Sequence, residues 1–169
     1  MEEYRYPEIF VEGADSNKYI CKVSDEYVLT ETPISDECYG HIIYEDILRY
    51  FDLSNPVLKK DVIVVPEFSD EELLKGLLIR KNTELCLIEI KGYEPYVYPR
   101  EGEKIDIRDK IGFVVTNKYE VRVIKSPCKG IVVFVINIVW EKPEKYILAV
   151  VSENDARQIT IRKSKRNSI

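Results

Sequence analysis

The sequence predicts a mainly β protein, α+β overall, in which an N-terminal β-rich region with two short helices precedes a second β-rich domain. Three observations support this class. Short segments rich in β-branched and aromatic residues recur along the chain and end at Gly, Pro, Asp or Asn. Only two stretches have apolar residues at helical spacing. A chain of 169 residues is long enough for one sizeable domain or two small ones.

The expected strands of the first part are short and are separated by turn-forming residues. They are residues 8–12, 18–23, 27–30, 62–65, 84–91 and 96–98. Turns at residues 13–17 and 24–26 connect the first three of them. This pattern predicts that the chain opens with a meander.

Two short helices are expected to pack on a sheet. The first covers residues 44–51, where apolar side chains recur at helical period before Asn55-Pro56. The second begins with a capping box, in which Ser69 accepts a hydrogen bond from the Glu72 amide. Its expected buried face consists of four leucines, Leu73, Leu74, Leu77 and Leu78.

A linker at residues 91–95 is followed only by expected strands. They are residues 104–107, 111–115, 119–124, 131–140, 146–151 and 158–162. The charge also changes sign near the linker: residues 1–90 hold 20 acidic and 9 basic side chains, and residues 91–169 hold 10 acidic and 16 basic ones. We therefore expect an N-terminal α+β region at 1–92, a β domain at 93–162 and a basic tail at 163–169.

The most specific pattern in the chain begins at Glu101. Residues 101–118 read EGEKIDIRDKIGFVVTNK and end with Thr116-Asn117-Lys118. Ser126-Pro127 and Gly130 follow in the pattern S-P-x-x-G. The segment resembles the half-repeat of biotinyl and lipoyl carrier domains, in which a lysine at a hairpin tip carries the prosthetic group. The whole chain is similar to an uncharacterised archaeal protein family that contains such a domain.

The resemblance implies a barrel-sandwich hybrid fold for residues 93–162. In that fold Ile105 and Ile111 would be core residues and Asp109 would lie in the second turn. The sequence departs from the carrier pattern in three ways. Arg108 replaces a glycine, the lysine-to-proline gap is one residue longer, and residues 140–146 replace the turns of the second half-repeat.

Strand alternation predicts the register of the lysine hairpin. Val115 is expected to lie opposite Val121, and Phe113 opposite Val123. The loop would then consist of Asn117-Lys118-Tyr119, with Lys118 exposed at its tip.

Lys118 has two interpretations. The resemblance implies an attachment site for a prosthetic group, flanked by Asn117 and Tyr119. Biotin is disfavoured because biotin ligases recognise methionines beside the lysine, whereas a lipoyl-type group tolerates more varied neighbours. The simpler interpretation is a solvated turn lysine without any cofactor, and this one is preferred.

Cys38 and His41 form the other candidate site. Their spacing is half of a metal-ligand pattern, but no further ligands follow locally, so no metal site is expected. A nucleophilic Cys38–His41 pair in a small enzyme is conceivable, although a structural histidine is favoured. The four cysteines lack a C-x-x-C pair, and buried free thiols are the default in a cytosolic protein. A Cys21–Cys38 bridge stays open as an alternative.

Several function classes can be set aside. The glycines are scattered, which excludes a phosphate-binding loop, and the basic residues of the tail lack interleaved aromatics, so no nucleic-acid site is expected. No apolar run is long enough for a membrane span. The first residues do not resemble a signal peptide, so a cytoplasmic location is expected. One His, one Met and one Gln among many charged residues are typical of proteins from hot environments.

The leading functional hypothesis is a non-catalytic binding or assembly module. Residues 131–140, which begin at Ile131 and end at Trp140, are apolar on both alternating faces. Such a strand needs cover on both sides, so a protein partner or a second subunit is expected to contact it. The alternatives are a carrier modified at Lys118 and a small enzyme that uses Cys38 and His41.

Overall fold

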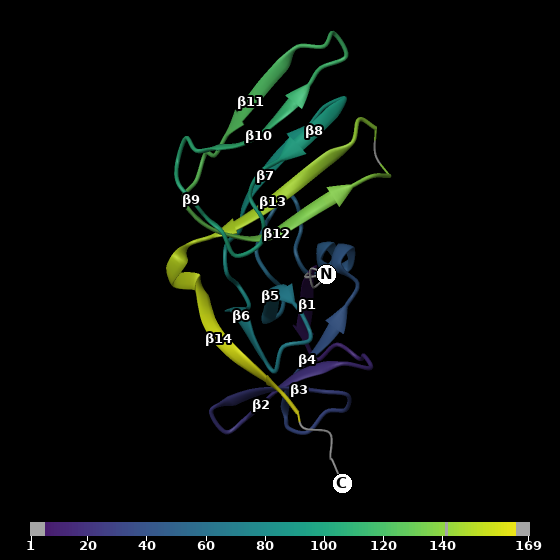
Figure 1. Cartoon of the computed structure of the whole chain (residues 1–169), viewed down its shortest axis with the longest axis vertical. Coiled ribbons are helices and arrows are strands. Elements are labelled where there is room, and N and C mark those ends of the chain that lie inside the picture. The colour runs from purple at the N-terminus through teal and green to yellow at the C-terminus, as the bar shows by residue number, and fades with distance from the viewer. Residues whose placement is uncertain (1–5, 141, 165–169) are drawn as a thin grey trace. The chain divides into compact units, whose positions relative to one another are not determined.

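The computed structural model describes residues 6–140 and 142–164, and strands dominate it (Figure 1). The mainly β class predicted from the sequence is confirmed. The chain forms two compact units. Within the described residues, unit 1 comprises 6–50, 58–82 and 157–164, and unit 2 comprises 51–57 and 83–156 without residue 141. The division at 92 and 163 stays a prediction about domains, and residues 165–169 of the expected tail lie outside the described residues.

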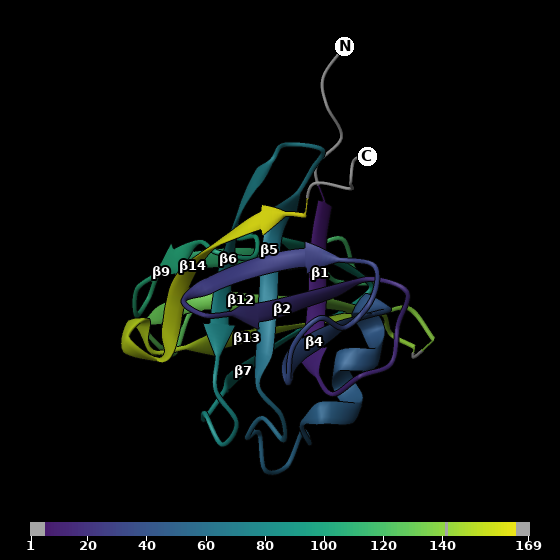
Figure 2. The same ribbon diagram turned by 90° about the horizontal axis from the view of Figure 1, so that it is seen from below.

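Unit 1 is a closed barrel with the strand order β1-β4-β2-β3-β14-β6-β5 (Figure 2). The strands are β1 (Tyr6–Glu12), β2 (Tyr19–Val23), β3 (Glu26–Thr30), β4 (Glu37–Ile42), β5 (Val62–Phe68), β6 (Leu73–Ile79) and β14 (Ala156–Lys163). Buried side chains from these strands, among them Phe10, Ile20 and Ile63, form one core cluster. The barrel is therefore a packed hydrophobic core.

The barrel is closed by β14, which comes from the C-terminal end of the chain. It runs parallel to β3, with Ile161 opposite Tyr27, and it also neighbours β6. Gly76 of β6 permits this approach, because a Cβ at this position would lie 2.8 Å from Ile161 Cδ1. The sequence predicts a strand at residues 158–162 and assigns it to the expected domain at 93–162. The pairing places it in unit 1 because its apolar face completes the barrel core.

Two strands of the barrel were missed or misassigned. The expected helix after Ser69 is wrong, because Leu73–Ile79 is strand β6. Leu74 and Leu78 belong to the barrel core and Leu77 is also buried, whereas Leu73 is exposed. Burial therefore alternates only at the beginning of this strand. Ser69 Oγ accepts from the Glu71 amide at 3.3 Å instead of capping a helix through Glu72.

The predicted opening meander is also wrong. β2 and β3 form the expected hairpin, but β1 does not pair with β2. Strand β4 (Glu37–Ile42), which the sequence analysis missed, lies between β1 and β2 and pairs with each of them. It has few β-branched residues, and its pairing with β1 and β2 compensates for its weak local propensity. The other expected helix is a 3-10 helix, η1 (Tyr44–Tyr50), in which Ile47 is buried.

Unit 2 consists of two sheets that share one core. One sheet has the order β11-β10-β8 and the other β7-β13-β12-β9. The strands are β7 (Cys86–Lys91), β8 (Glu94–Val97), β9 (Lys104–Ile105), β10 (Lys110–Val115), β11 (Val121–Lys125), β12 (Gly130–Ile138) and β13 (Lys145–Val151), and η2 (Glu153–Asp155) follows. Ile111 and Val114 of the first sheet pack with Ile90, Val132 and Leu148 of the second.

Strand β12 is buried on both faces, as its sequence predicts. Val132 belongs to the core between the two sheets. Outside that core, Val133 and Ile136 of the same strand are also fully buried. The ring of Phe134 stacks on the ring of Phe51, with a distance of 6.1 Å between the ring centroids. Only the end of the expected segment, Val139 and Trp140, is exposed.

No helix among the described residues is long and apolar enough to cross a membrane.

The closing role of β14 leads to a stability prediction. Ile161→Ala removes a fully buried side chain from the barrel core and should lower the free energy of unfolding by about 2–5 kcal/mol, as measured by urea denaturation. Thr160→Ala, at the exposed neighbouring position, is the matched control and should change it by less than about 0.5 kcal/mol. Equal effects of the two substitutions would contradict the position of β14 in the barrel.

Candidate functional site

The lysine hairpin has the geometry predicted from the sequence. β10 and β11 pair antiparallel, with Val115 opposite Val121 and Phe113 opposite Val123. Lys118 is exposed in the connecting turn. The hairpin and the position of its lysine are therefore confirmed, while the role of Lys118 as an attachment site stays a prediction.

The hairpin tip, residues 116–120, is held by backbone hydrogen bonds. The Thr116 amide donates to the Glu120 carbonyl at 2.8 Å, and the Tyr119 amide donates to the Thr116 carbonyl at 2.9 Å. Thr116 Oγ1 accepts from the amides of Lys118 at 3.3 Å and Glu120 at 3.2 Å. Tyr119 has a φ of 62°, in the left-handed region where a three-residue hairpin loop usually has glycine.

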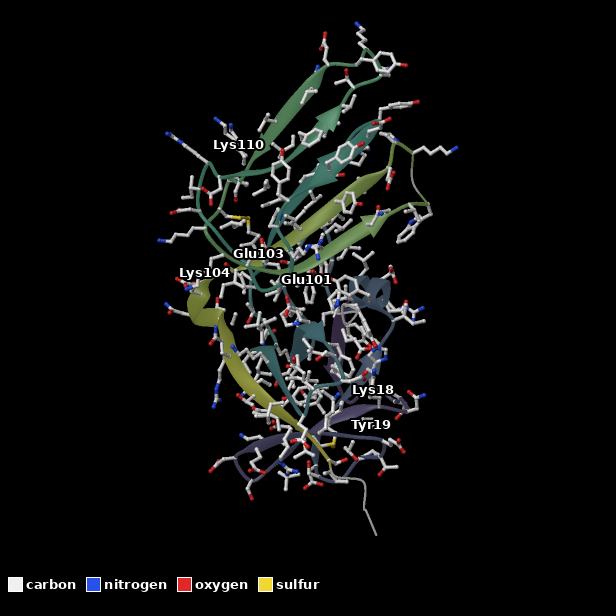
Figure 3. The ribbon with its side chains drawn as sticks, in the orientation of Figure 1. Lys18, Tyr19, Glu101, Glu103, Lys104 and Lys110 are labelled. Carbon is white, nitrogen blue, oxygen red and sulfur yellow. A yellow bond between two sulfur atoms is a disulfide. The ribbon has the colours of Figure 1, made fainter. Side chains whose placement is uncertain are left out.

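The two turns on either side of β9 follow the pattern that suggested the resemblance. Gly102 adopts a φ of 90° in the first turn, between Glu101 and Glu103 (Figure 3). In the second turn Arg108 takes a φ of 73°, at the position where the carrier pattern has glycine. Ile105 and Ile111 are both buried in the core of unit 2, as expected. The local turn geometry therefore persists at Arg108 without the glycine.

The hairpin has an apolar outer face that is exposed. Tyr96, Phe113 and Val123 lie side by side across β8, β10 and β11. The rings of Tyr96 and Phe113 stack at a centroid distance of 4.6 Å, and Tyr98 also contacts Phe113 at 5.9 Å. Tyr96 is 46% exposed and Val123 is 48% exposed. The sequence predicts the pairing of Phe113 with Val123, and the structure shows that these two side chains lie on the outer face beside Tyr96 of β8.

The inner face of the same hairpin borders a cavity of about 450 Å³, named here the tip cavity. It lies between the hairpin and the turn that connects β7 to β8. Its lining residues are Lys91, Gly92, Tyr93, Val114, Thr116, Asn117, Arg122, Ile124 and Pro143. Among the described residues, the charged side chains of this lining are two cations, Lys91 and Arg122.

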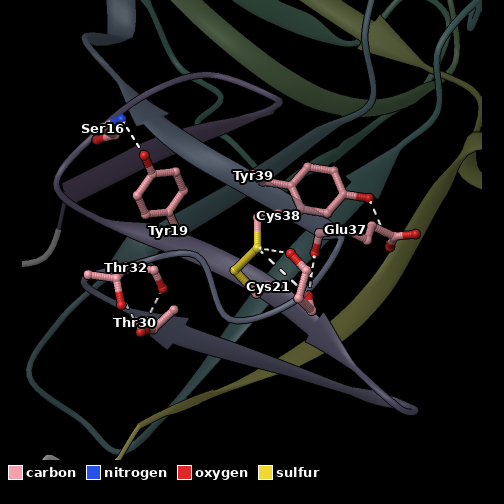
Figure 4. Close-up of a disulfide and its surroundings, with 9 residues drawn as sticks. Ser16, Tyr19, Cys21, Thr30, Thr32, Glu37, Cys38 and Tyr39 are labelled. Atoms are coloured by element: carbon pink, nitrogen blue, oxygen red, sulfur yellow. Dashed lines mark hydrogen bonds between the residues drawn. A yellow bond between two sulfur atoms is a disulfide. The ribbon is translucent and has the colours of Figure 1, made fainter.

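The alternative of a nucleophilic Cys38–His41 pair is excluded by the state of Cys38. Cys38 is bonded to Cys21 in a disulfide, so its sulfur cannot act as a thiolate (Figure 4). The two cysteines lie directly opposite each other on β2 and β4, with a Cα–Cα distance of 4.0 Å. Cys86 and Cys128 form a second disulfide. The default of buried free thiols is thus wrong, because folding brings together cysteines that are distant in sequence. Strand pairing does so for Cys21 and Cys38, whereas Cys128 meets Cys86 of β7 from the loop before β12.

His41 belongs to an ionic cluster of the barrel. Glu8 is buried and accepts two hydrogen bonds from Lys18 Nζ, at 2.9 and 2.7 Å. His41 Nε2 lies 3.6 Å from Glu8 Oε1, and Lys18 Nζ lies 4.3 Å from the centre of the Phe68 ring. Burial lowers the pKa of His41 below its ordinary value of 6.5; Glu8 opposes this shift and Lys18 adds to it. The imidazole is therefore neutral near pH 7, which agrees with the structural role predicted for it.

The sequence offered no signal for Lys91 and Arg122 as neighbours, because they lie on strands that are not adjacent in the chain. Alternation does place Arg122 on the same face as the buried Val114 opposite it, so an inward-facing arginine could have been recognised. Among residues 6–140 and 142–164, no group of three or more His, Cys, Asp or Glu side chains could hold a metal ion.

Comparison with known proteins gives two matches. The family model described as "Uncharacterized protein conserved in archaea (DUF2118)" matches residues 4–153. An uncharacterized protein of Methanocaldococcus jannaschii is 27% identical over 167 residues, which cover 93% of this chain and 98% of that relative.

The strained tip makes a testable prediction. Tyr119→Gly removes the steric cost of the left-handed conformation, so it should raise the free energy of unfolding by about 0.5–1 kcal/mol relative to Tyr119→Ala. Tyr119→Ala is the matched control because it removes the same exposed ring and keeps the strain. If the two variants unfold at the same denaturant concentration, the tip does not hold residue 119 at positive φ in solution.

The lowered pKa of His41 predicts a pH dependence of stability. In the unfolded chain this imidazole binds a proton near pH 6.5, whereas in the folded barrel it binds one only at lower pH. Stability should be fully present above about pH 6.5 and fall as the pH drops toward the folded pKa. Urea denaturation between about pH 8 and about pH 5 should show a smaller loss for His41→Gln than for the natural chain. Equal losses would contradict the lowered pKa.

Proposed function

The chain belongs to the archaeal family DUF2118, and on this premise we propose that it is a non-catalytic binding module with a biotinyl/lipoyl-like unit 2. The two-sheet core, the glycine turn at Gly102 and the lysine hairpin support the barrel-sandwich hybrid architecture. The absence of a thiol at Cys38 removes the enzyme hypothesis that rested on it.

The observation that carries this proposal is the exposed outer face of the hairpin sheet. Stacked aromatic rings beside β-branched side chains form one contiguous apolar surface, and tyrosine is enriched in the centres of protein interfaces. A contiguous exposed apolar face of this kind supports an interaction site. We propose that a protein partner with an apolar surface of its own covers Tyr96, Phe113 and Val123.

In this proposal, only the end of the segment 131–140 is available as a partner surface. Ile131 through Ile138 are largely buried, so their side chains are not available to a partner. Val139 and Trp140 remain exposed at the end of β12, and a partner could still contact them. The outer face of the hairpin sheet is therefore the larger of the two candidate surfaces.

A second candidate function is a carrier modified at Lys118. It is favoured by one observation, the exposure of this ammonium group at the tip of a hairpin, flanked by Asn117 and Tyr119. A lipoyl-type amide at this position would protrude into solvent. The backbone hydrogen bonds of the hairpin tip would then hold the lysine in a position that a ligase can reach.

We also propose that this protein is cytoplasmic and comes from an organism of hot environments. Intracellular disulfides are rare except in hyperthermophiles. The disulfides Cys21–Cys38 and Cys86–Cys128 agree with a composition that has one His, one Met and one Gln. Both features favour this cellular setting.

The partner proposal is tested by affinity capture from native cells. The natural chain should retain a stoichiometric protein, and Val123→Glu should reduce its recovery by about tenfold because a charge enters the apolar face. Ile43→Glu, at an exposed apolar side chain of unit 1, should leave recovery unchanged. Capture of nothing, or equal recovery with both variants, would refute the proposal.

The intact mass of the chain purified from the same cells separates the two functions. A binding module has the mass of the unmodified sequence. A carrier shows an adduct that disappears in Lys118→Arg and persists in Lys125→Arg, which changes another exposed lysine of the hairpin.

A further inference from the structure

We propose that the tip cavity binds a small carboxylate with an apolar body. The cavity is on the opposite face of the hairpin from Tyr96 and Val123, so this inference does not depend on the proposed partner surface. It assigns unit 2 a second binding site, for a small molecule.

The position of Arg122 is the first argument. Val121 and Val123 on either side of it belong to the exposed outer face, and strand alternation turns Arg122 to the inner face with Ile124. Arg122 is exposed at the mouth of the cavity, so its guanidinium group is accessible to a ligand from solvent. Among the described residues no acidic side chain lines the cavity, and Arg122 has no ion pair or hydrogen bond with any of them. An anionic ligand could therefore pair with Arg122 without displacing a partner.

Lys91 supplies a second cation from the other side of the cavity. It ends β7, and like Arg122 it has no ion-pair partner among the described residues. Two uncompensated cations facing one cavity create a positive potential there. Arginine binds a carboxylate through two parallel N–H···O bonds, while lysine adds a point charge. The pair therefore fits one carboxylate group.

The neutral polar groups of the cavity are donors as well. Thr116 Oγ1 already accepts hydrogen bonds from two backbone amides of the tip. Its own hydroxyl proton has no acceptor among the described residues and is therefore available to an anion. The side-chain amide of Asn117 can donate in the same way. A site with four donor side chains selects an acceptor-only ligand.

The rest of the lining is apolar and determines the body of the ligand. Val114 and Ile124 form part of the core of unit 2, and Tyr93 and Pro143 also line the cavity. Gly92 keeps this space open toward the hairpin, because a Cβ at this position would overlap Val114 Cγ1. A cavity of about 450 Å³ is within the usual size range of small-molecule sites. A fully hydrated inorganic anion would leave these apolar surfaces uncovered.

Titration with octanoate, followed by the backbone amide resonances of the full chain, tests this assignment. Octanoate should shift the amides of Gly92, Thr116 and Asn117 in a saturable manner, with a Kd of about 1 mM or tighter. Octanol, which has the same body without the charge, and inorganic phosphate, which has charge without the body, should each bind at least about tenfold more weakly.

The variants identify the groups responsible. The double variant with Lys91→Gln and Arg122→Gln should weaken octanoate binding by about tenfold or more, while Lys125→Gln, at an exposed hairpin lysine outside the cavity, should not. All of these side chains are exposed at the surface, so the folded spectrum of each variant should be kept. The assignment is overturned by an absence of saturable shifts, by octanol or phosphate binding as tightly as octanoate, or by equal effects of the double variant and Lys125→Gln.

Discussion

The antiparallel pairing of β10 with β11 is the constraint on which the functional surfaces of this protein depend. With Val115 opposite Val121, the alternation of side chains gives the hairpin two chemically different faces. The outer face is aromatic and aliphatic and is exposed, whereas the inner face holds Val114 and Arg122 beside the tip cavity. Lys118 lies at the turn between the strands. The proposed docking surface, the proposed anion site and the candidate attachment lysine therefore all depend on one register.

The tip determines that register. A loop of three residues, closed by the Thr116–Glu120 hydrogen bond, requires its third residue to adopt the left-handed conformation, and Tyr119 does so. A slip of one residue would move Arg122 to the outer face and Val123 into the cavity. The apolar face and the cation would then exchange places. The tip tolerates strain at Tyr119 because the hydrogen bonds of Thr116 hold the backbone in place.

Unit 1 shows the same dependence on distant pairing. Its barrel is complete only when β14, from the far end of the chain, lies between β3 and β6. The ionic cluster of Glu8, Lys18 and His41 is drawn from β1, β4 and the start of β2, which the strand order β1-β4-β2 brings together. The buried Glu8 carboxylate is stabilised by the two hydrogen bonds from Lys18, so a buried charge is retained only as part of a pair.

The sequence by itself determined the features that depend on neighbours along the chain. The mainly β class, most strand positions, the register of the hairpin, the exposure of Lys118 and the burial of β12 all follow from alternation and turn chemistry within short segments. Only the tertiary structure decided that Leu73–Ile79 is a strand, that β14 closes the barrel and that Cys21 is bonded to Cys38. It also decided that Lys91 and Arg122 share one cavity. These outcomes depend on contacts between segments that are far apart in sequence. Packing against a partner strand overrides local propensity there. The periodicity of a segment does not identify the strand with which it pairs.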